Sequence, residues 1–314
     1  MGAYLLRRII GLVPVLLLVG VTAFFLVHII PGDPAAVMLG ADATPHQIDQ
    51  IRQEMGLESP LYIQFFIWAG KVLRGDLGES YFLGRSVSSA LIERLPATIS
   101  LAVVSLFIAV FIGVPAGIIA AVKQNKLMDQ AVMVLALIGV SVPSFWLGLL
   151  LMLVFSVNLR WFPSGGYVPL TENVIEGLRC MIMPAFALGF MQAALIARMA
   201  RSSMLEVLRQ DYIRTARSKG LRERLVVLRH ALKNAMIPVL TVIGIAFGVL
   251  LGGAIIVETV FTYPGVGRLV VKAVQHRDYP LVQGALLLIS GIYVLVNLLV
   301  DMLYPLVDPR IKYK

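Results

Sequence analysis

Charged residues are scarce in this 314-residue sequence. Only 14% of the residues are Asp, Glu, Lys or Arg, whereas soluble domains have about 25%, and 59% are apolar. With a mean hydropathy of +0.86, the chain has too few polar side chains to cover a water-soluble core of this size. Much of its apolar surface must therefore face lipid, and the composition indicates an integral membrane protein.

Several chemical motifs are missing as well. The single cysteine, Cys180, cannot form an intrachain disulfide or supply a cysteine-rich metal site. No Gly-x-x-x-x-Gly-Lys-[Ser/Thr] motif occurs, so the chain has no P-loop for ATP. His28 is the only histidine in an uncharged stretch and no His-Glu-x-x-His occurs, which argues against an intramembrane protease. We expect no enzymatic activity, no cofactor and no metal site.

Long uncharged apolar stretches are abundant. A helix needs about 20 apolar residues to cross the hydrocarbon core, and inside lipid only a helix satisfies its own backbone. Six stretches meet or approach that length: 9–30, 95–122, 130–159, 180–197, 234–257 and 279–300. We therefore predict an all-α polytopic protein with six transmembrane helices. The first stretch exceeds the apolar core of a signal peptide and is read as a retained anchor.

The distribution of Lys and Arg predicts the orientation. If the N-terminus is cytoplasmic, the inside segments hold 17 basic and 5 acidic residues, and the outside segments hold 10 basic and 11 acidic residues. Positive charge accumulates on the cytoplasmic side of membrane proteins. We therefore place both termini of a multi-pass membrane protein in the cytoplasm. The net charge of +9 would suggest a nucleic-acid partner in a soluble protein, but its distribution around the spans matters more here than its sum, and we expect no nucleic-acid partner.

The spans divide the chain into four parts. Residues 1–30 form a cytoplasmic start and the first span, 31–94 an extracytoplasmic helical loop, 95–306 a five-helix core and 307–314 a cytoplasmic tail. In the outer loop, Thr44-Pro45-His46-Gln47 is typical of a helix start, and a second, aromatic helix is predicted over 60–74. That aromatic helix either lies along the membrane interface or packs against the spans.

The inner loop 198–233 holds ten basic and three acidic residues interleaved with apolar ones, and it is too apolar for a solvated linker. We expect Asp211 to cap a short helix that ends at Gly220, because a glycine adopts the left-handed conformation without strain. Such a helix suits a groove on another protein. Alternatively, its arginines bind anionic lipid and fix the orientation.

Residues 211–220, Asp-Tyr-Ile-Arg-Thr-Ala-Arg-Ser-Lys-Gly, resemble the signature loop of ABC-importer permeases. Thr215 and Arg217 stand where the general pattern has Glu and a second Ala, as in the dipeptide, oligopeptide, glutathione and nickel branch. His-Ile-Ile-Pro-Gly-Asp-Pro at 28–34, Gly-Asp-Leu-Gly-Glu-Ser at 75–80 and Tyr-Pro-Gly-Val-Gly at 263–267 also resemble that branch. The similarity runs almost end to end and is strongest to the first permease subunit of such importers.

The resemblance implies a type I ABC importer permease fold and an ATP-driven importer that moves short peptides across the bacterial inner membrane by alternating access. It further implies a second homologous permease, two cytoplasmic ATPases and an extracytoplasmic binding protein as partners, with membrane lipid around the spans. The helix around 214–220 would be the coupling helix that docks on an ATPase. The matching coupling residues are Asp211, Tyr212, Arg214, Thr215, Ala216, Arg217, Lys219 and Gly220.

Polar residues in or near the spans are candidates for lining a pathway. They are Ser141, Ser144, Gln192, Glu258, Gln283, Asn297 and Asp301. Hydrogen bonds between helices explain the five uncharged residues at least as well, whereas Glu258 and Asp301 either face a cavity or a partner or lie at the headgroup level. Pro143 predicts a kink beside the two serines. Gly244, Gly248 and Gly252 share one helix face, which favours close helix packing.

Two alternatives stay open. One is an ABC permease for nickel or another small solute, because the sequence does not identify the cargo. The other is an ion-coupled secondary transporter, although the hydropathy pattern shows no inverted repeat.

Overall fold

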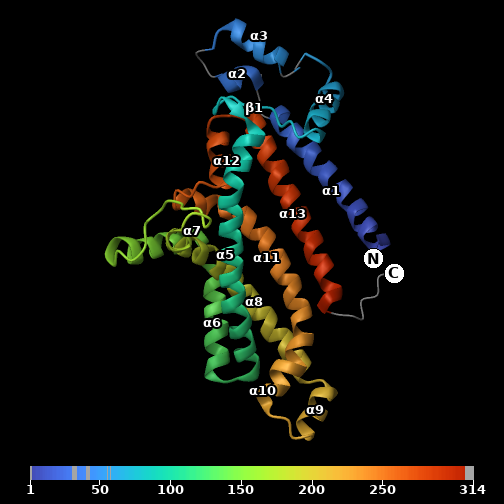
Figure 1. The fold of residues 1–314 in the computed structure, drawn as a ribbon, viewed down its shortest axis with the longest axis vertical. Coiled ribbons are helices and arrows are strands. Elements are labelled where there is room, and N and C mark those ends of the chain that lie inside the picture. The colour runs from blue at the N-terminus through green and yellow to red at the C-terminus, as the bar shows by residue number, and fades with distance from the viewer. Residues whose placement is uncertain (1, 30–33, 40–42, 55, 57, 308–314) are drawn as a thin grey trace. The chain divides into compact units, whose positions relative to one another are not determined.

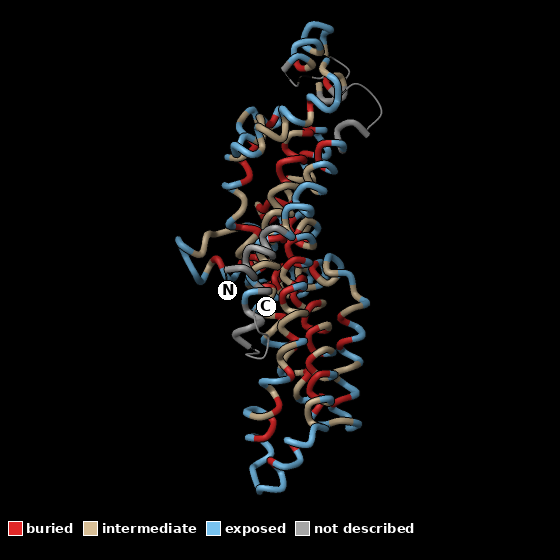
Figure 2. The backbone as a smooth tube through the Cα atoms, turned by 90° about the vertical axis from the view of Figure 1, so that its right-hand side faces the viewer, coloured by how far each residue is buried: buried red, intermediate tan, exposed pale blue. Residues whose placement is uncertain are grey.

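The structure, a computed structural model, describes residues 2–29, 34–39, 43–54, 56 and 58–307 (Figure 1). It is almost entirely helical and separates into two compact units. The first unit comprises Met1–Pro96 and Gly265–Val294, and the second comprises Ala97–Pro264 and Leu295–Lys314. Figure 2 shows how buried and exposed turns are distributed along the helices.

The first unit contains the N-terminal helix and the small helices that follow it. Its elements are α1 (Gly2–Ile29), α2 (Pro34–Leu39), α3 (Pro45–Glu54), α4 (Leu61–Leu73), β1 (Glu79–Ser80), β2 (Arg85–Ser86), α12 (Val266–Gln275) and parts of α5 (Val87–Val122) and α13 (Tyr279–Val307). The strands form an antiparallel hairpin in which Glu79 pairs with Ser86 and Ser80 with Arg85. This hairpin leads directly into α5.

Both helices predicted in the loop between the first two spans are present. The Thr44 backbone N–H donates to Gln47 Oε1 at 2.9 Å, and the Gln47 N–H donates to Thr44 Oγ1 at 3.4 Å. This reciprocal arrangement is a capping box, and it starts α3 at Pro45 as predicted. Helix α4 matches the predicted aromatic helix to within one residue at each end.

The first unit is held by an apolar cluster and one buried carboxylate. The cluster includes Val87 and Leu91 of α5 and Leu281 of α13. Asp278, 2% exposed, accepts hydrogen bonds from Ser80 Oγ at 2.5 Å and from the backbone N–H groups of Phe82 and Leu281 at 3.0 and 3.2 Å. Asp278 thereby joins the hairpin to the start of α13.

The second unit is built around one long helix. Its elements are most of α5, α6 (Leu127–Ser141), α7 (Ser144–Leu151), the π-helix η1 (Met152–Asn158), α8 (Val174–Leu208), α9 (Asp211–Ser218), α10 (Glu223–Leu225), the π-helix η2 (Val226–Ala231), α11 (Leu232–Val260) and the end of α13. Helix α8 packs against α6, α7 and α11. In its most apolar stretch 72% of the residues are buried, so α8 lies at the centre of this unit.

Glycines let α5 and α8 approach closely. A Cβ atom at Gly113 would lie 2.6 Å from the Ala193 carbonyl oxygen, and one at Gly117 would lie 2.5 Å from the Ala197 carbonyl oxygen. A Cβ at Gly252 of α11, by contrast, would meet nothing within 4 Å. The predicted close packing therefore does not extend to Gly252, whereas Gly244 and Gly248 of the same predicted face are buried.

Four of the six predicted spans agree with the structure, whereas the first is represented by a shorter apolar helix among the described side chains and the third differs. Among the described residues, four stretches, Val87–Val122, Val174–Leu208, Glu223–Val260 and Tyr279–Leu299, are long and apolar enough to cross a membrane. They contain four of the six predicted spans. Helix α1 covers the first, with an apolar helix over Gly11–Phe25 among its described side chains.

The third predicted span, 130–159, is not one kinked helix. It forms two helices, Leu127–Ser141 and Ser144–Asn158, bent by 102°. Val142 is extended, with φ −86° and ψ 122°, because the ring of Pro143 disfavours a helical residue before it, and Pro143 has no N–H to continue the ladder. The predicted kink is therefore a complete break in the helix.

Candidate functional site

Helix α9 carries six of the eight residues expected to couple the chain to a partner, and Lys219 and Gly220 follow it directly. It runs from Asp211 to Ser218, beside the ends of α8 and α11 in the second unit (Figure 1). Asp211 was predicted to be the cap, but the helix starts at Asp211 and Gln210 occupies the N-cap position. A carboxylate in the first turn still stabilises the helix through its dipole. Gly220 follows the helix with φ +74°, as predicted.

Two apolar residues seat α9 on the second unit. Ile213 is fully buried and Ala216 is 7% exposed, and a spacing of three residues puts both on one face of the helix. They pack in a cluster with Ala121 of α5, Met204 of α8 and residues of η2 and α11. Burying an Ile side chain contributes about 2 kcal/mol, so this seat fixes the helix firmly.

Polar contacts fix both ends of α9. The Asn234 amide of α11 donates to Tyr212 Oη at 2.7 Å. Arg217 donates from Nε and Nη2 to the two carboxylate oxygens of Glu223, at 3.1 and 2.7 Å. This hydrogen bonding raises the pKa of Arg217 above its ordinary value, although partial burial opposes the effect. A forked arginine–carboxylate pair restricts the orientation of the helix as well as its position.

The outer face of α9 is polar and exposed. The Asp211 side chain is 96% exposed and that of Arg214 is 74% exposed, and their contact at 3.4 Å is weak. Tyr212, Thr215, Lys219 and Gly220 are also exposed. The helix thus combines a fixed apolar seat with a free face of mixed charge, which is the arrangement a docking element requires.

Two of the candidate pathway residues in the second unit, Glu258 and Ser141, form hydrogen bonds with protein groups. Glu258 of α11 is fully buried and accepts a hydrogen bond from Thr98 Oγ1 at 2.7 Å. Ser141 donates to the Leu137 carbonyl of its own helix at 2.9 Å. Gln192 is 3% exposed in α8, and Ser144 and Asn297 are half-buried. Glu258 and Gln192 are therefore the members of this group most shielded from solvent.

The remaining two candidates are Gln283 and Asp301. Gln283 belongs to the first unit, where its Nε2 donates to the Ala23 carbonyl at 3.0 Å and links α13 to α1. This contact matches the alternative expectation of a hydrogen bond between helices. Asp301 lies within α13, but its side chain falls outside the described residues, as does that of His28.

One ion pair was missed by the sequence reasoning. Arg201 of α8 donates from Nε and Nη2 to the two carboxylate oxygens of Asp129, at 2.5 and 2.8 Å, and the Asn125 backbone N–H donates to the same carboxylate at 2.9 Å. Asp129 is 3% exposed, so the pair ties the turn between α5 and α6 to α8. The only available signal was that both charges flank spans on the same predicted side.

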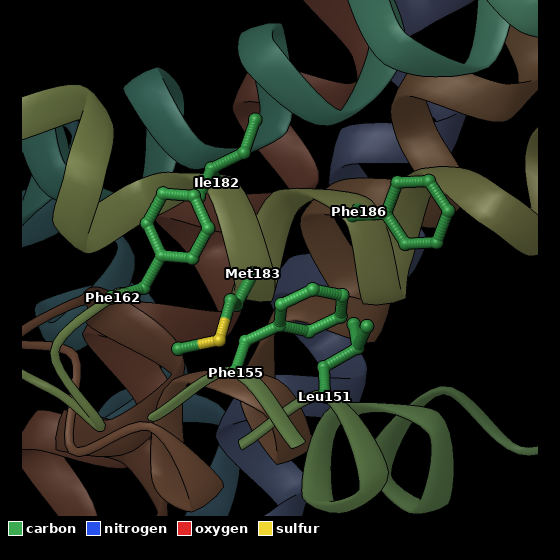
Figure 3. Close-up of a pocket in the computed structure, with 6 residues that line it drawn as sticks. All are labelled: Leu151, Phe155, Phe162, Ile182, Met183 and Phe186. Carbon is green, nitrogen blue, oxygen red and sulfur yellow. The ribbon is translucent and has the colours of Figure 1, made fainter. Parts of the chain in front are cut away.

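The second unit also contains an apolar cavity of about 190 Å³ (Figure 3). It is lined by Leu151 and Phe155 from α7 and η1, by Phe162, and by Ile182, Met183 and Phe186 from α8. These side chains offer no strong hydrogen-bonding groups. The cavity therefore does not match the polar backbone of a peptide.

The described residues thus form a helical membrane protein with several apolar spans and a charged helix, α9, seated on the second unit. Residues 113–313 match the family described as the binding-protein-dependent transport system inner membrane component, and residues 1–102 match the N-terminal region of such components. The chain belongs to this family of permeases.

Relatives in several bacteria extend over the whole chain. A putative peptide transport system permease protein of Brucella abortus (strain 2308) is 46% identical over 100% of both chains. The glutathione transport system permease protein GsiC of Salmonella choleraesuis is 46% identical over 99% of both, and the dipeptide transport system permease protein DppB of Alkalihalophilus pseudofirmus is 42% identical over 100% of both.

A solved structure shows the same fold. An inward-facing form of the MetNI methionine ABC transporter matches with a TM-score of 0.55 and 20% identity, covering 69% of this chain and 96% of that chain. The fold is therefore that of a type I ABC importer permease, as the resemblance implied.

Proposed function

We propose that this permease takes part in the import of short peptides across the bacterial inner membrane and is driven by separate ATPase subunits that dock on α9. The observation that carries the proposal is the construction of α9. Its apolar side is buried in the second unit, while its charged side is exposed. A helix built in this way binds a groove on a cytoplasmic partner and keeps its own position.

The connections of α9 explain how force would reach the spans. Met204 of α8 and Ala235 of α11 lie in the cluster that seats Ile213, and Asn234 of α11 bonds Tyr212. A displacement of α9 therefore moves α8 and α11 with it, because well-packed side chains transmit motion as a body. Closure of the ATPases on ATP would thereby switch the permease between inward- and outward-facing states.

The assignment of partners and orientation follows from this function. Two ATPases require two docking helices, so the complex contains a second, homologous permease that supplies the other helix. An extracytoplasmic binding protein delivers the cargo at the opposite side of the membrane. Both termini and the 198–233 segment face the cytoplasm, where ten basic residues of that segment satisfy the charge rule.

The relatives named for peptide, dipeptide and glutathione transport support a peptide as cargo. Peptide backbones need hydrogen-bonding partners along a pathway. Ser141, Ser144, Gln192, Glu258, Gln283, Asn297 and Asp301 remain the residues proposed for that role. Gln192 and Glu258 are buried in the described conformation and would need an opened state to reach the cargo.

Charge reversal on the free face of α9 tests the coupling. Arg214→Glu keeps the buried seat intact but opposes the native charge, so we expect binding-protein-stimulated ATP hydrolysis to fall by at least tenfold, equivalent to about 1.4 kcal/mol of coupling. Lys123→Glu makes the same charge change on the exposed turn between α5 and α6 and serves as the matched control. Hydrolysis and ATPase co-purification are measured on the complex in proteoliposomes.

Three results would contradict the proposal, the last of them only in its assignment of the cargo. Normal stimulation in Arg214→Glu would show that α9 does not dock the ATPase. Uptake of a labelled dipeptide by vesicles that contain the chain without ATPases, driven by an ion gradient, would establish the secondary-transporter alternative. Uptake of nickel with no uptake of a dipeptide or glutathione would contradict the cargo assignment alone.

A further inference from the structure

Helix α4 has two unlike faces, and the aromatic side chains of the inner face pack against α1. Phe65 and Trp68 lie against Phe24 of α1, with ring centroids 5.3 and 5.6 Å apart. Gln64 is 9% exposed, and its Nε2 donates to the Ser59 carbonyl at 2.7 Å. This face attaches α4 to α1 within the first unit.

The outer face of α4 is exposed and entirely apolar. Phe66 is 70% exposed, Tyr62 66%, Ile67 53% and Ile63 37%. At 100° per residue, the arc from Tyr62 to Ile67 covers about 140° of the helix. Leu73, 88% exposed, falls in the same arc, which contains no charged residue. A contiguous apolar face of this kind marks a contact with lipid or with another protein.

The surroundings of this face favour lipid. The Phe24 ring that holds α4 also contacts Phe25 of α1, with centroids 5.5 Å apart, and Phe25 is 41% exposed. Leu17 and Leu18 of α1 are 59% and 69% exposed, so the apolar surface of α4 continues an apolar helix that belongs to the first span. Phe25 lies close to the end of that span, which places α4 near the level of the lipid headgroups.

The C-terminal end of α4 carries basic groups suited to that level. Lys71 lies in the last turn and Arg74 directly after the helix, and both are exposed. Their long side chains reach phosphate groups while their stems stay among apolar atoms. Tyr62 and Trp68 are residue types that concentrate at membrane interfaces.

We propose that α4 is an interfacial helix whose outer face, formed by Tyr62, Ile63, Phe66, Ile67 and Leu73, is embedded between the headgroups and acyl chains of the outer phospholipid layer. The helix anchors the segment that follows the first span to the membrane surface. The proposal rests on contacts within the first unit and is independent of the coupling assigned to α9.

Site-directed spin labelling tests this directly. In a Cys180→Ala background, single cysteines are introduced by Tyr62→Cys, Phe66→Cys and Ile67→Cys and labelled with a nitroxide in the complete transporter. The complex is reconstituted in vesicles of phosphatidylethanolamine and phosphatidylglycerol. Collision rates with oxygen, which concentrates in lipid, and with a water-soluble nickel chelate are then measured. Gln53→Cys on exposed α3 is the aqueous control, and Leu17→Cys on α1 is the lipid control.

The expected ratio of oxygen to nickel-chelate collisions at all three α4 positions is several-fold above that at Gln53→Cys and closer to that at Leu17→Cys. A ratio equal to that at Gln53→Cys would show a water-exposed face and overturn the proposal. Low collision rates with both reagents would also overturn it, because they would show that a protein partner covers the face.

Discussion

The two units of this permease hold their helices together in different ways. In the second unit, glycines such as Gly117 bring the α5 and α8 backbones into contact. The ion pair between Asp129 and Arg201 joins the start of α6 to α8. In the first unit, larger side chains fill the core, and Asp278 joins the hairpin to α13 through three hydrogen bonds. Helices whose backbones are in contact have little freedom to shift relative to each other, whereas contacts made by side chains adapt more easily to such shifts.

This difference matches the parts that the two units play in the proposed mechanism. The second unit carries α9 and has to pass its displacement to the spans, which requires a stiff body. The first unit carries α4, whose attachment to lipid requires position but not transmission of force. The comparison predicts that substitutions in the second unit lower the free energy of unfolding more than substitutions in the first unit.

The largest effect is expected for Asp129→Ala. This change leaves Arg201, whose side chain is only 25% exposed, without its carboxylate, and breaking such a pair costs about 3 kcal/mol of unfolding free energy. The measurement is denaturant unfolding of the protein in bicelles. Asp211→Ala, at an aspartate that is 96% exposed, is the control and should change the free energy by less than about 0.5 kcal/mol. Equal losses of unfolding free energy in the two variants would show that the ion pair between Asp129 and Arg201 does not stabilise the second unit.

A smaller loss is expected for Gly117→Ala. The added methyl group would lie 2.6 Å from the Ala200 Cβ as well as against the Ala197 carbonyl, so α5 and α8 must separate at a cost of about 2 kcal/mol. Gly252→Ala is the matched control. Its methyl group meets open space, and the gain in helix propensity should stabilise α11 by up to about 1 kcal/mol. A stable Gly117→Ala protein would show that the contact between α5 and α8 is loose.

The smallest loss is expected in the first unit. Asp278→Asn keeps one acceptor oxygen but loses the charge, so we expect a cost of about 1 kcal/mol in the same unfolding measurement. The substitution leaves the size of the side chain almost unchanged. A cost above that of Asp129→Ala would reverse the comparison between the two units.

The helices could be predicted from the sequence because the features that start and extend them lie close together along the chain. Uncharged runs located the long helices, and the Thr44–Gln47 capping box located the start of α3. The packing of α9 against the second unit was predicted only in part. The apolar residues of the 198–233 loop indicated that it was not solvated, but which of them are buried depends on the contacts of Ile213 with distant elements.

The features that escaped prediction depend on distant contacts. Asp129 and Arg201 are 72 positions apart, and nothing local distinguishes them from ordinary charges beside a span. Pro143 indicated a bend, but the angle of 102° depends on how α7 packs against α8. Gly252 has the spacing of a packing glycine, yet its neighbours in space leave room for a side chain.

Cross-linking from α9 tests the central claim most directly. A single cysteine is introduced by Arg214→Cys in the Cys180→Ala background, and the transporter is treated with a short bifunctional thiol reagent in the presence of ATPase subunits that carry a cysteine in their docking cleft. We expect a covalent permease–ATPase adduct, with no adduct when the cysteine is introduced instead by Lys123→Cys. An actively hydrolysing complex that yields no adduct at the Arg214 position for any cysteine along the cleft would contradict the account.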